Sequence, residues 1–307
     1  MAMHARELVN QKGILVVPAV YDALSAKIAE HVGFKAVGLG GFLVAASRLG
    51  LPDVGYLTMS EMVEACRAMA GAVGIPVLAD GDTGYGNPLN VRRTVQEYEA
   101  AGAQAIFLED QVWPKKCGHI PGPRQVVSLD EHLKKLEAAL EARRDLRTLI
   151  IARTDSRGPL GFDEAIRRAR AYQKAGVDGV FIEALQTLEE VRRAPAELPG
   201  VALVSNMFSR GKTPLCTVAE LEGFGYKIVL WVTDALWAAA KAVKEVLETL
   251  RDEGTTARVH NRLMGFEEYF DLVGLPKHQR LEARYAPNAS ERVEVLGKTG
   301  PSPPSGQ

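Results

Sequence analysis

Short apolar segments alternate along the chain with longer segments in which apolar residues recur every three or four positions. The short segments are rich in Val, Ile and Leu, as buried strands are, and they span residues 14–19, 35–40, 76–80, 105–109, 149–153, 179–183, 202–206 and 227–231. The longer segments predict amphipathic helices at residues 22–32, 60–73, 90–101, 129–142, 162–175 and 217–223. This alternation predicts an α/β fold, a (β/α)8 TIM-type barrel.

Polar or glycine residues stand at the carboxyl ends of most of these predicted strands. They are Gly40, Gly41, Asp80, Asp82, Glu109, Asp110, Arg153, Asp155, Glu183 and Asn206. In a barrel these strand ends meet at one mouth, where active sites are built. An open sheet would leave several of them far apart, so their placement favours the barrel.

The chain continues beyond the eighth predicted strand. The apolar pattern predicts two extra C-terminal helices, at residues 234–252 and 256–272. Because no low-complexity linker interrupts the pattern, we expect residues 1–290 to form a single domain. Residues 291–307 are rich in Pro, Ser and Gly, and we expect them to be disordered.

Composition narrows the class of protein. The 307 residues carry 37 basic and 38 acidic side chains, so no bulk charge recruits nucleic acid or an anionic membrane. Residues 1–13 lack the apolar core of a signal peptide, and no segment has the length of a membrane span. The three cysteines make an odd number without close pairing, which favours free thiols and a cytoplasmic location.

Two aspartates, Asp80 and Asp82, lie two positions apart at a predicted strand end. Carboxylates without nearby His or Cys ligands suit a hard cation such as Mg²⁺ or Mn²⁺. The alternative is an Asx turn over Asp82 and Thr83, with Asp80 solvated. Glu109 and Asp110 at the next strand end favour the metal, because an uncompensated acidic pocket is costly.

Cys117 lies in a predicted loop beside Lys115, Lys116 and His119. Neighbouring cations lower the pKa of a thiol, and Gly118 permits the loop to move. Such a thiol can act as a nucleophile or as a general acid that protonates a carbanion. The alternative is an ordinary loop cysteine next to surface lysines.

Arg153 ends an apolar strand, and its guanidinium can bind a carboxylate with two hydrogen bonds. Asp155 or Glu183 could orient it, although structural ion pairs of this kind are common in barrels. Residues 38–41 contain three glycines but no dinucleotide fingerprint, so they indicate close approach of the backbone to a ligand. Asp53 is a candidate partner for metal-bound water, or else a turn residue.

Several motifs together carry a resemblance to a known family. They lie at residues 18–26, 49–53, 80–86, 109–111, 115–119, 151–155, 182–184 and 211–214. In this order they resemble the isocitrate lyase / phosphoenolpyruvate mutase superfamily. Within it, Lys-Lys-Cys-Gly-His at residues 115–119 is similar to the carbon–carbon lyase branch, which includes 2-methylisocitrate and 2,3-dimethylmalate lyases. Carboxyphosphonoenolpyruvate mutases carry a similar cysteine motif.

The resemblance implies a role for each matching position. Asp80 and Asp82 would hold the metal partly through water, with Asp53 and Glu109 in its outer shell. The substrate-binding residues would be Gly40, Gly41, Arg153, Glu183 and Asn206. Cys117 would protonate the enolate of the second product, with Lys116 and His119 on a closing loop. Relatives swap a C-terminal helix between subunits, which implies a homodimer or homotetramer here.

The chain also departs from the family pattern. Gly38 stands where relatives place a Tyr proposed as the base, so the catalytic base is not identified. Ser209 replaces a Glu, residues 231–234 replace a Tyr-Pro-Leu-Ser/Thr pattern, and Gly81 replaces an Ala. These changes imply an unusual substrate.

Phe42, Leu43 and Trp231 suggest that the substrate carries an apolar substituent. We therefore expect a Mg²⁺-dependent lyase that cleaves a substituted 2-hydroxy di- or tricarboxylic acid, a small-molecule substrate, to pyruvate or glyoxylate plus a carboxylate. The alternatives are an oxaloacetate hydrolase or decarboxylase, a phosphonate mutase, and a non-catalytic relative that binds a 2-oxo acid.

Overall fold

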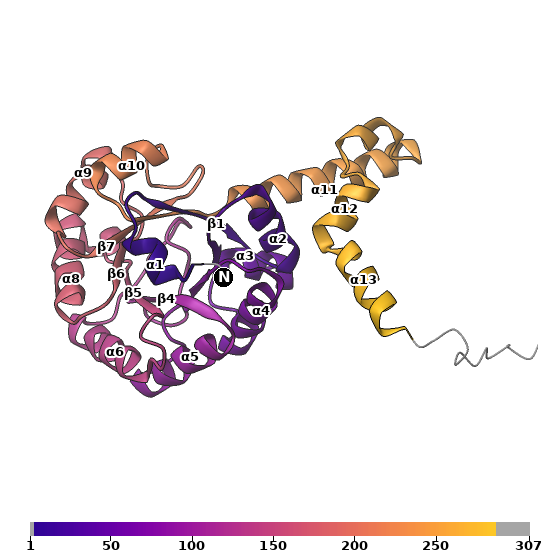
Figure 1. Ribbon diagram of the computed structural model, residues 1–307. Helices are drawn as coiled ribbons and strands as arrows, with labels where there is room; N and C mark the ends of the chain where they lie inside the picture. Colours follow the sequence, from indigo (N-terminus) through magenta and orange to yellow (C-terminus); the bar gives the residue numbers. More distant parts are fainter. Residues whose placement is uncertain (1–2, 287–307) are drawn as a thin grey trace, which may run out of the picture. The chain divides into compact units, whose positions relative to one another are not determined.

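A computed structural model describes residues 3–286, and it divides the chain into two compact units at residues 261 and 262 (Figure 1). The first unit is a closed barrel of parallel strands in chain order, with the eighth strand paired to the first. The strands are β1 (Leu15–Val20), β2 (Val37–Leu39), β3 (Val77–Asp80), β4 (Ala103–Glu109), β5 (Leu149–Thr154), β6 (Gly179–Ile182), β7 (Ala202–Met207) and β8 (Ile228–Trp231). All eight predicted strands and the (β/α)8 architecture are confirmed.

Helices surround the barrel (Figure 1). They are α2 (Ala23–Val32), α4 (Met59–Ala72), α5 (Pro88–Ala100), α6 (Leu129–Ala142), α8 (Phe162–Lys174), α9 (Leu188–Glu197) and α10 (Val218–Phe224), with short α3 (Gly41–Val44), a π-helical turn (Ala45–Leu49) and α7 (Arg157–Leu160) among the loops. Local chemistry sets their ends: Thr58 caps α4 in a reciprocal pair with Glu61, and Gly33 ends α2 with φ of +102°. The pattern did not predict α9.

Two apolar layers hold the barrel together. Outward side chains of the strands, such as Val37 and Leu39, pack against the helices. Inward side chains such as Val17 and Phe107 fill the barrel, and α1 (Ala5–Asn10) adds Leu8 to this inner cluster. Because side chains alternate along a strand, the last inward positions become the polar residues at the mouth.

The chain beyond the barrel strands is more broken than the sequence predicts. Helix α11 (Asp234–Glu253) confirms the first C-terminal helix. The single helix expected over residues 256–272 is wrong: a 3₁₀ turn (Ala257–Arg262) is followed by α12 (Phe266–Val273) and α13 (Leu275–Tyr285). Gly265 and Gly274 flank α12, and Gly274 has φ of +81°, which suits glycine rather than a helix interior.

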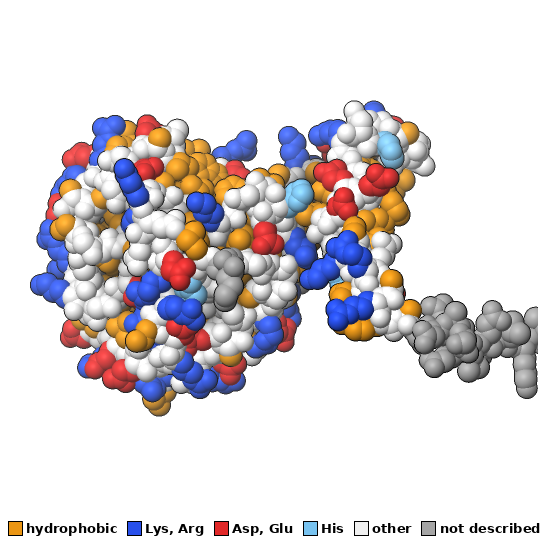
Figure 2. All heavy atoms as spheres, in the orientation of Figure 1, with side chains coloured by type: hydrophobic (Ala, Val, Ile, Leu, Met, Phe, Trp, Pro, Cys, Tyr) orange, Lys and Arg blue, Asp and Glu red, His pale blue; other side chains and the backbone are white. Residues whose placement is uncertain are grey.

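The surface agrees with the balanced composition. On the face of the barrel drawn in Figure 2, basic and acidic side chains are interspersed. Within residues 3–286, no helix is both long and apolar enough to cross a membrane. The expected disordered tail, residues 291–307, lies outside the described residues.

Candidate active site

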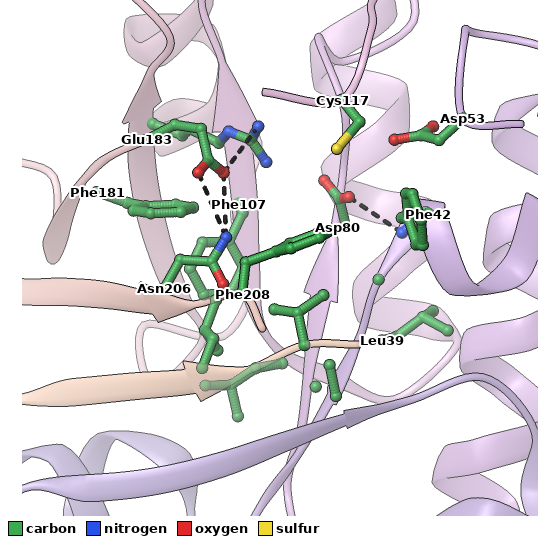
Figure 3. Close-up of a pocket in the computed structure, with 18 of the residues that line it drawn as sticks. Leu39, Phe42, Asp53, Asp80, Phe107, Cys117, Phe181, Glu183, Asn206 and Phe208 are labelled. Carbon is green, nitrogen blue, oxygen red and sulfur yellow. Dashed lines mark hydrogen bonds and ion pairs between the residues drawn. The ribbon is translucent and has the colours of Figure 1, made fainter. Parts of the chain in front are cut away.

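A pocket at the carboxyl-terminal mouth of the barrel gathers most of the polar residues that the sequence singled out (Figure 3). It encloses about 620 Å³ of empty space, including its open mouth. Of the predicted site residues, those that line it are Gly40, Gly41, Asp53, Asp80, Cys117, His119, Arg153, Glu183 and Asn206. Asp82 and Glu109 are buried but do not line it.

Lys115 is the cation at the centre of the acidic cluster. Its Nζ lies 2.7 Å from Asp53 Oδ1 and 2.8 Å from Asp82 Oδ1. Burial lowers the pKa of Lys115, but the carboxylates of Asp82 and Asp53 outweigh this and hold the pKa well above its ordinary value. Lys115 is therefore a fixed positive charge.

The acidic groups around Lys115 have perturbed pKa values of their own. Burial raises the pKa of Asp82 to about 6, although Lys115 opposes the shift. Burial also holds the pKa of Glu109 well above its ordinary value, against the pull of Arg153. Neither oxygen of Glu109 accepts a hydrogen bond within residues 3–286. Arg153, 3.2 Å away, compensates Glu109 in part, but Arg153 is shared with Asp155 and Glu183. A buried cluster that holds more carboxylates than cations favours a further cation.

The residues present fit a divalent cation held by oxygen. Asp80 Oδ2, Asp82 Oδ1 and Lys115 Nζ converge beside Gly41, where an added Cβ would meet them at 3.2 to 3.3 Å. Among the described residues, no three His, Cys, Asp or Glu side chains form a ready metal cage. Mg²⁺ commonly uses one or two carboxylates plus water and substrate, so a partial set suits it better than a full cage.

Gly41, which lines the pocket, contacts the carboxylate of Asp80. Its backbone N–H donates to Asp80 Oδ2 at 3.1 Å. In this arrangement the amide orients the Asp80 carboxylate, because a donor bound to the carboxylate is already in use. The glycine still matters sterically, since any side chain there would enter the acidic cluster.

Cys117 lies buried in the loop between β4 and α6, with 7% of its surface exposed. The expectation that neighbouring lysines lower its pKa is wrong. Burial, followed by the negative charge of Asp53, raises the pKa of the thiol to about 12, and Lys115 opposes this only weakly. The sulfur therefore carries its proton at neutral pH, which favours a proton donor over a thiolate nucleophile.

The cysteine loop is docked over the pocket by His119. Its Nδ1 accepts a hydrogen bond from the backbone N–H of Lys212 at 3.0 Å, so the ring proton resides on Nε2. That Nε2 lies 3.0 Å from Glu183 Oε1. Lys212 Nζ also donates to the carbonyl of Gly118 at 3.0 Å. These contacts join the loop to the ends of β6 and β7.

Arg153 is held by three carboxylates. Its Nε lies 2.8 Å from Asp155 Oδ2 and 3.2 Å from Glu109 Oε2, and its Nη2 lies 3.1 Å from Glu183 Oε2. The expected contacts with Asp155 and Glu183 are both present. Burial raises the pKa of Glu183, but Arg153 and His119 outweigh it and lower the pKa to about 2. Arg153 thus presents a rigid positive charge to the pocket.

The two lysines of the cysteine loop differ in burial, and two residues to which the sequence gave no role contact this loop. Lys116 is exposed and does not line the pocket, whereas Lys115 is buried. The sequence held a signal for this difference in burial. In an extended loop successive side chains point to opposite sides, so Lys115 and Cys117 share one side and Lys116 faces the other. Phe208, whose ring stacks on His119 with centroids 4.2 Å apart, and Lys212 were given no role.

The other two cysteines follow the prediction that they serve packing. Cys66 is fully buried in α4, and Cys216 Sγ lies 3.7 Å from the carbonyl of Pro214. All three cysteines are free.

Comparison with known proteins identifies the family. Residues 5–251 match the model of the family described as phosphoenolpyruvate phosphomutase. The chain is 46% identical to the 2,3-dimethylmalate lyase of Eubacterium barkeri over 93% of its own length and 98% of the relative's. It is 41% identical to a 2-methylisocitrate lyase of Aeropyrum pernix, over 93% of this chain and 91% of that one.

Solved structures are similar over the whole barrel. Oxaloacetate acetylhydrolase bound to 3,3-difluorooxalacetate superposes with a TM-score of 0.88 at 35% identity, covering 94% of this chain and 98% of that one. Phosphonopyruvate hydrolase bound to oxalate and Mg²⁺ superposes with a TM-score of 0.83 at 35% identity, covering 91% and 97%. The chain belongs to the phosphoenolpyruvate mutase / isocitrate lyase superfamily.

Proposed function

We propose that this protein is a carbon–carbon lyase that uses Mg²⁺ or Mn²⁺ and cleaves a substituted 2-hydroxy di- or tricarboxylic acid. The products are pyruvate or glyoxylate and a carboxylate. The observation that carries the proposal is the buried thiol of Cys117, which lines the same pocket as Asp80 and Arg153. Burial raises its pKa to about 12, which suits a proton donor. The named lyases among its relatives support the same reaction type.

Binding and orientation come from the charged groups of the pocket. Arg153, fixed by Asp155 and Glu183, would bind a substrate carboxylate. Asp80 and Asp82 would hold the cation, with Asp53 and Glu109 around its water ligands. When bound, the cation stabilises negative charge on the oxygens of the oxo-acid fragment. Lys115 keeps this acidic cluster compact and buried.

The chemical step breaks the bond between C2 and C3. The 2-hydroxyl group gives its proton to water and becomes a carbonyl, while the bonding electrons pass to C3 and form an enolate of the second carboxylate. Cys117 Sγ–H gives its proton to C3. The thiolate left after protonation of C3 regains a proton from water, so protons balance over the cycle. The Glu183–His119 contact and the Lys212 contacts hold the thiol loop closed during this step. Gly38 has no side chain that could serve as the base.

A structural relative suggests a second activity to be tested. Oxaloacetate acetylhydrolase shares the fold closely, so hydrolysis of oxaloacetate is the second candidate. A phosphonate mutase and a non-catalytic oxo-acid-binding protein are the remaining outcomes. Lyase cleavage and hydrolysis of oxaloacetate both leave a carbanion that must be protonated, so the thiol of Cys117 suits either, and their products distinguish them.

A substrate screen tests the proposal. The protein is incubated with a panel of 2-hydroxy di- and tricarboxylic acids and oxaloacetate, with Mg²⁺ or with EDTA, and products are identified by mass spectrometry. We expect pyruvate or glyoxylate from at least one hydroxy acid, dependent on Mg²⁺. Acetate and oxalate from oxaloacetate alone would favour the hydrolase. Mg²⁺-dependent binding without any product would favour the non-catalytic protein.

We also propose a homodimer or homotetramer in the cytoplasm. Helix α11 exposes Trp237, Val243, Leu247 and Leu250, an apolar set that suits exchange of a C-terminal helix between subunits. The three free cysteines suit a reducing compartment. Light scattering after size-exclusion chromatography tests the assembly, and a monomer would contradict it.

A further inference from the structure

An apolar hollow lies in the barrel floor beneath the charged groups of the pocket. It begins at two of the smallest residues, Ala19 on β1 and Gly38 on β2, which are register partners on neighbouring strands. Both line the pocket. Barrel interiors are normally filled by layers of bulky side chains. Two small residues side by side leave this layer open.

No neighbouring side chain fills the space that Gly38 leaves. A Cβ added to Gly38 would lie 3.5 Å from the nearest atoms of Ala19 and Val17, which is an ordinary van der Waals contact. Gly38 is not in a positive-φ conformation, so its backbone does not require glycine. Neither the backbone conformation nor the packing around its Cβ position requires glycine at residue 38, and the space left there opens on the pocket.

Most of the rest of the hollow is hydrocarbon, with the amide of Asn206 at its edge. Its other walls are Leu78, Phe107, Phe181 and Leu230. The rings of Phe107 and Phe181 meet edge to face, with centroids 6.2 Å apart. None of these side chains can donate or accept a conventional hydrogen bond, so a carboxylate or hydroxyl placed here would lose its water without compensation.

The charged groups fix which part of a ligand enters the hollow. In Figure 3, the carboxylates of Asp53, Asp80 and Glu183 and the thiol of Cys117 lie along one side of the pocket, and the rings of Phe107 and Phe208 lie toward the other. A diacid held by Arg153 and the acidic cluster keeps its polar atoms on the first side. A substituent on its reacting carbon points toward the floor.

The expectation of an apolar substituent rested partly on other residues. Phe42 lines the pocket, but Leu43 and Trp231 do not. Val232 and Leu230 take the place that the sequence gave to Trp231. The prediction of an apolar surface for the substrate is thus kept, but that surface lies in the hollow beside Gly38 rather than at Leu43 and Trp231.

We propose that the substrate is a 2-hydroxy diacid whose C3 carries a hydrocarbon chain of two or more carbons, and that Gly38 sets the length of this chain. The proposal rests on the lyase function above and sharpens its substrate class. It favours an alkyl-substituted malate over a tricarboxylic acid, because among the described lining residues the hollow has the Asn206 amide but no cation beyond Arg153 for a third carboxylate.

Chain-length kinetics test this assignment. The values of kcat/KM are measured with Mg²⁺ for malates bearing hydrogen, methyl, ethyl, propyl or butyl at C3, using the wild type, Gly38→Val and Gly71→Leu. Gly71 is exposed on α4 with nothing within 4 Å of an added Cβ, so Gly71→Leu is the matched control. We expect kcat/KM of the wild type to rise about fourfold per methylene beyond methyl until the hollow is full. Gly38→Val should abolish this rise while still turning over the methyl compound.

A binding measurement separates failure of this inference from failure of the lyase proposal. Calorimetric titration of the same proteins with 2-alkylsuccinates and Mg²⁺ needs no turnover. If no malate is cleaved but affinity rises with chain length only when Gly38 is intact, the result supports the assignment of the hollow and contradicts the lyase proposal. The inference about the hollow is contradicted if, in both assays, the wild type shows no dependence on chain length. It is also contradicted if the dependence is identical in the wild type and in Gly38→Val.

Discussion

Glu109 and Asp110 are neighbours in the sequence, yet they belong to two opposite kinds of buried cluster. Asp110 accepts four hydrogen bonds, from Thr154 Oγ1, the Asp155 amide, Arg168 Nη1 and Tyr172 OH, at 2.7 to 3.0 Å. Glu109 is equally buried, and its oxygens accept none from the described residues. Asp110 therefore has four hydrogen-bond donors, whereas Glu109 has an ion pair with Arg153, 3.2 Å away, that Arg153 shares with Asp155 and Glu183.

The difference follows from strand geometry. Glu109 ends β4 with its carboxylate near Arg153 in the barrel interior, and the next residue points to the outer side, toward Arg168 and Tyr172 of α8. A satisfied buried network stabilises the fold, whereas an unsatisfied one costs stability and marks a functional site. The comparison separates the residues that build the barrel from those that act in it.

The largest expected difference comes from neutralising each carboxylate. Glu109→Gln should lower kcat/KM about 10- to 100-fold, the usual effect of losing an outer-shell partner of a metal. Its free energy of unfolding should fall less than that of Asp110→Asn, because Glu109 loses one ion pair that Arg153 also shares with Asp155 and Glu183. Asp110→Asn should lower the free energy of unfolding by about 3 kcal/mol, since Arg168 would keep an uncompensated buried charge.

Steady-state kinetics and urea unfolding of both variants measure these changes. A large loss of stability in Glu109→Gln, or a loss of activity in folded Asp110→Asn, would erase the distinction between the two clusters.

The two arginines offer a smaller test of the same kind. Arg153→Lys keeps the charge but loses the planar contacts with Asp155 and Glu183, so kcat/KM should fall about tenfold. Arg168→Lys should leave kcat/KM unchanged and lower the free energy of unfolding by about 1 kcal/mol. Equal effects of both variants on activity would contradict the assignment of Arg168 to the fold.

The smallest effect concerns His132, which packs against Tyr172 with ring centroids 4.9 Å apart. Burial lowers its pKa to about 4; Asp110 opposes the shift, and Lys135 and Arg168 add to it. Because the unfolded chain binds the proton more readily, the wild type should lose stability as pH falls from about 6.5 to 4. His132→Phe should flatten this slope without changing activity at pH 7. A wild-type slope retained in the variant would assign it to other groups.

The barrel could be predicted because its signals are local and repeated. Each strand is a short apolar run, and the polar residue that follows it, such as Asp80 or Asn206, lies at the mouth as expected. The prediction of one helix over residues 256–272 failed because the apolar spacing continues across a break at Gly265. There the 3₁₀ turn has ended and α12 has not yet begun.

The site itself was only partly predictable. Charges near Cys117 in the sequence suggested a lowered pKa, but the pKa depends on burial and on Asp53, which is 64 positions away in the chain and near only after folding. The same holds for Lys115, whose partners Asp53 and Asp82 come from other loops. The hollow beside Gly38 could not be predicted either, because it depends on the register that pairs Ala19 of β1 with Gly38 of β2.

Proton donation by Cys117 is the central claim, and Cys117→Ser tests it most directly. The variant is compared with wild type and with Cys216→Ser, a control whose sulfur lies outside the pocket. Oxo-acid release is measured with the best hydroxy acid from the screen, and binding of a 2-alkylsuccinate with Mg²⁺ is measured by calorimetry. The account predicts that Cys117→Ser loses about 10²- to 10⁴-fold in kcat while binding is retained, and that Cys216→Ser keeps wild-type kcat. Wild-type oxo-acid release by Cys117→Ser would contradict it.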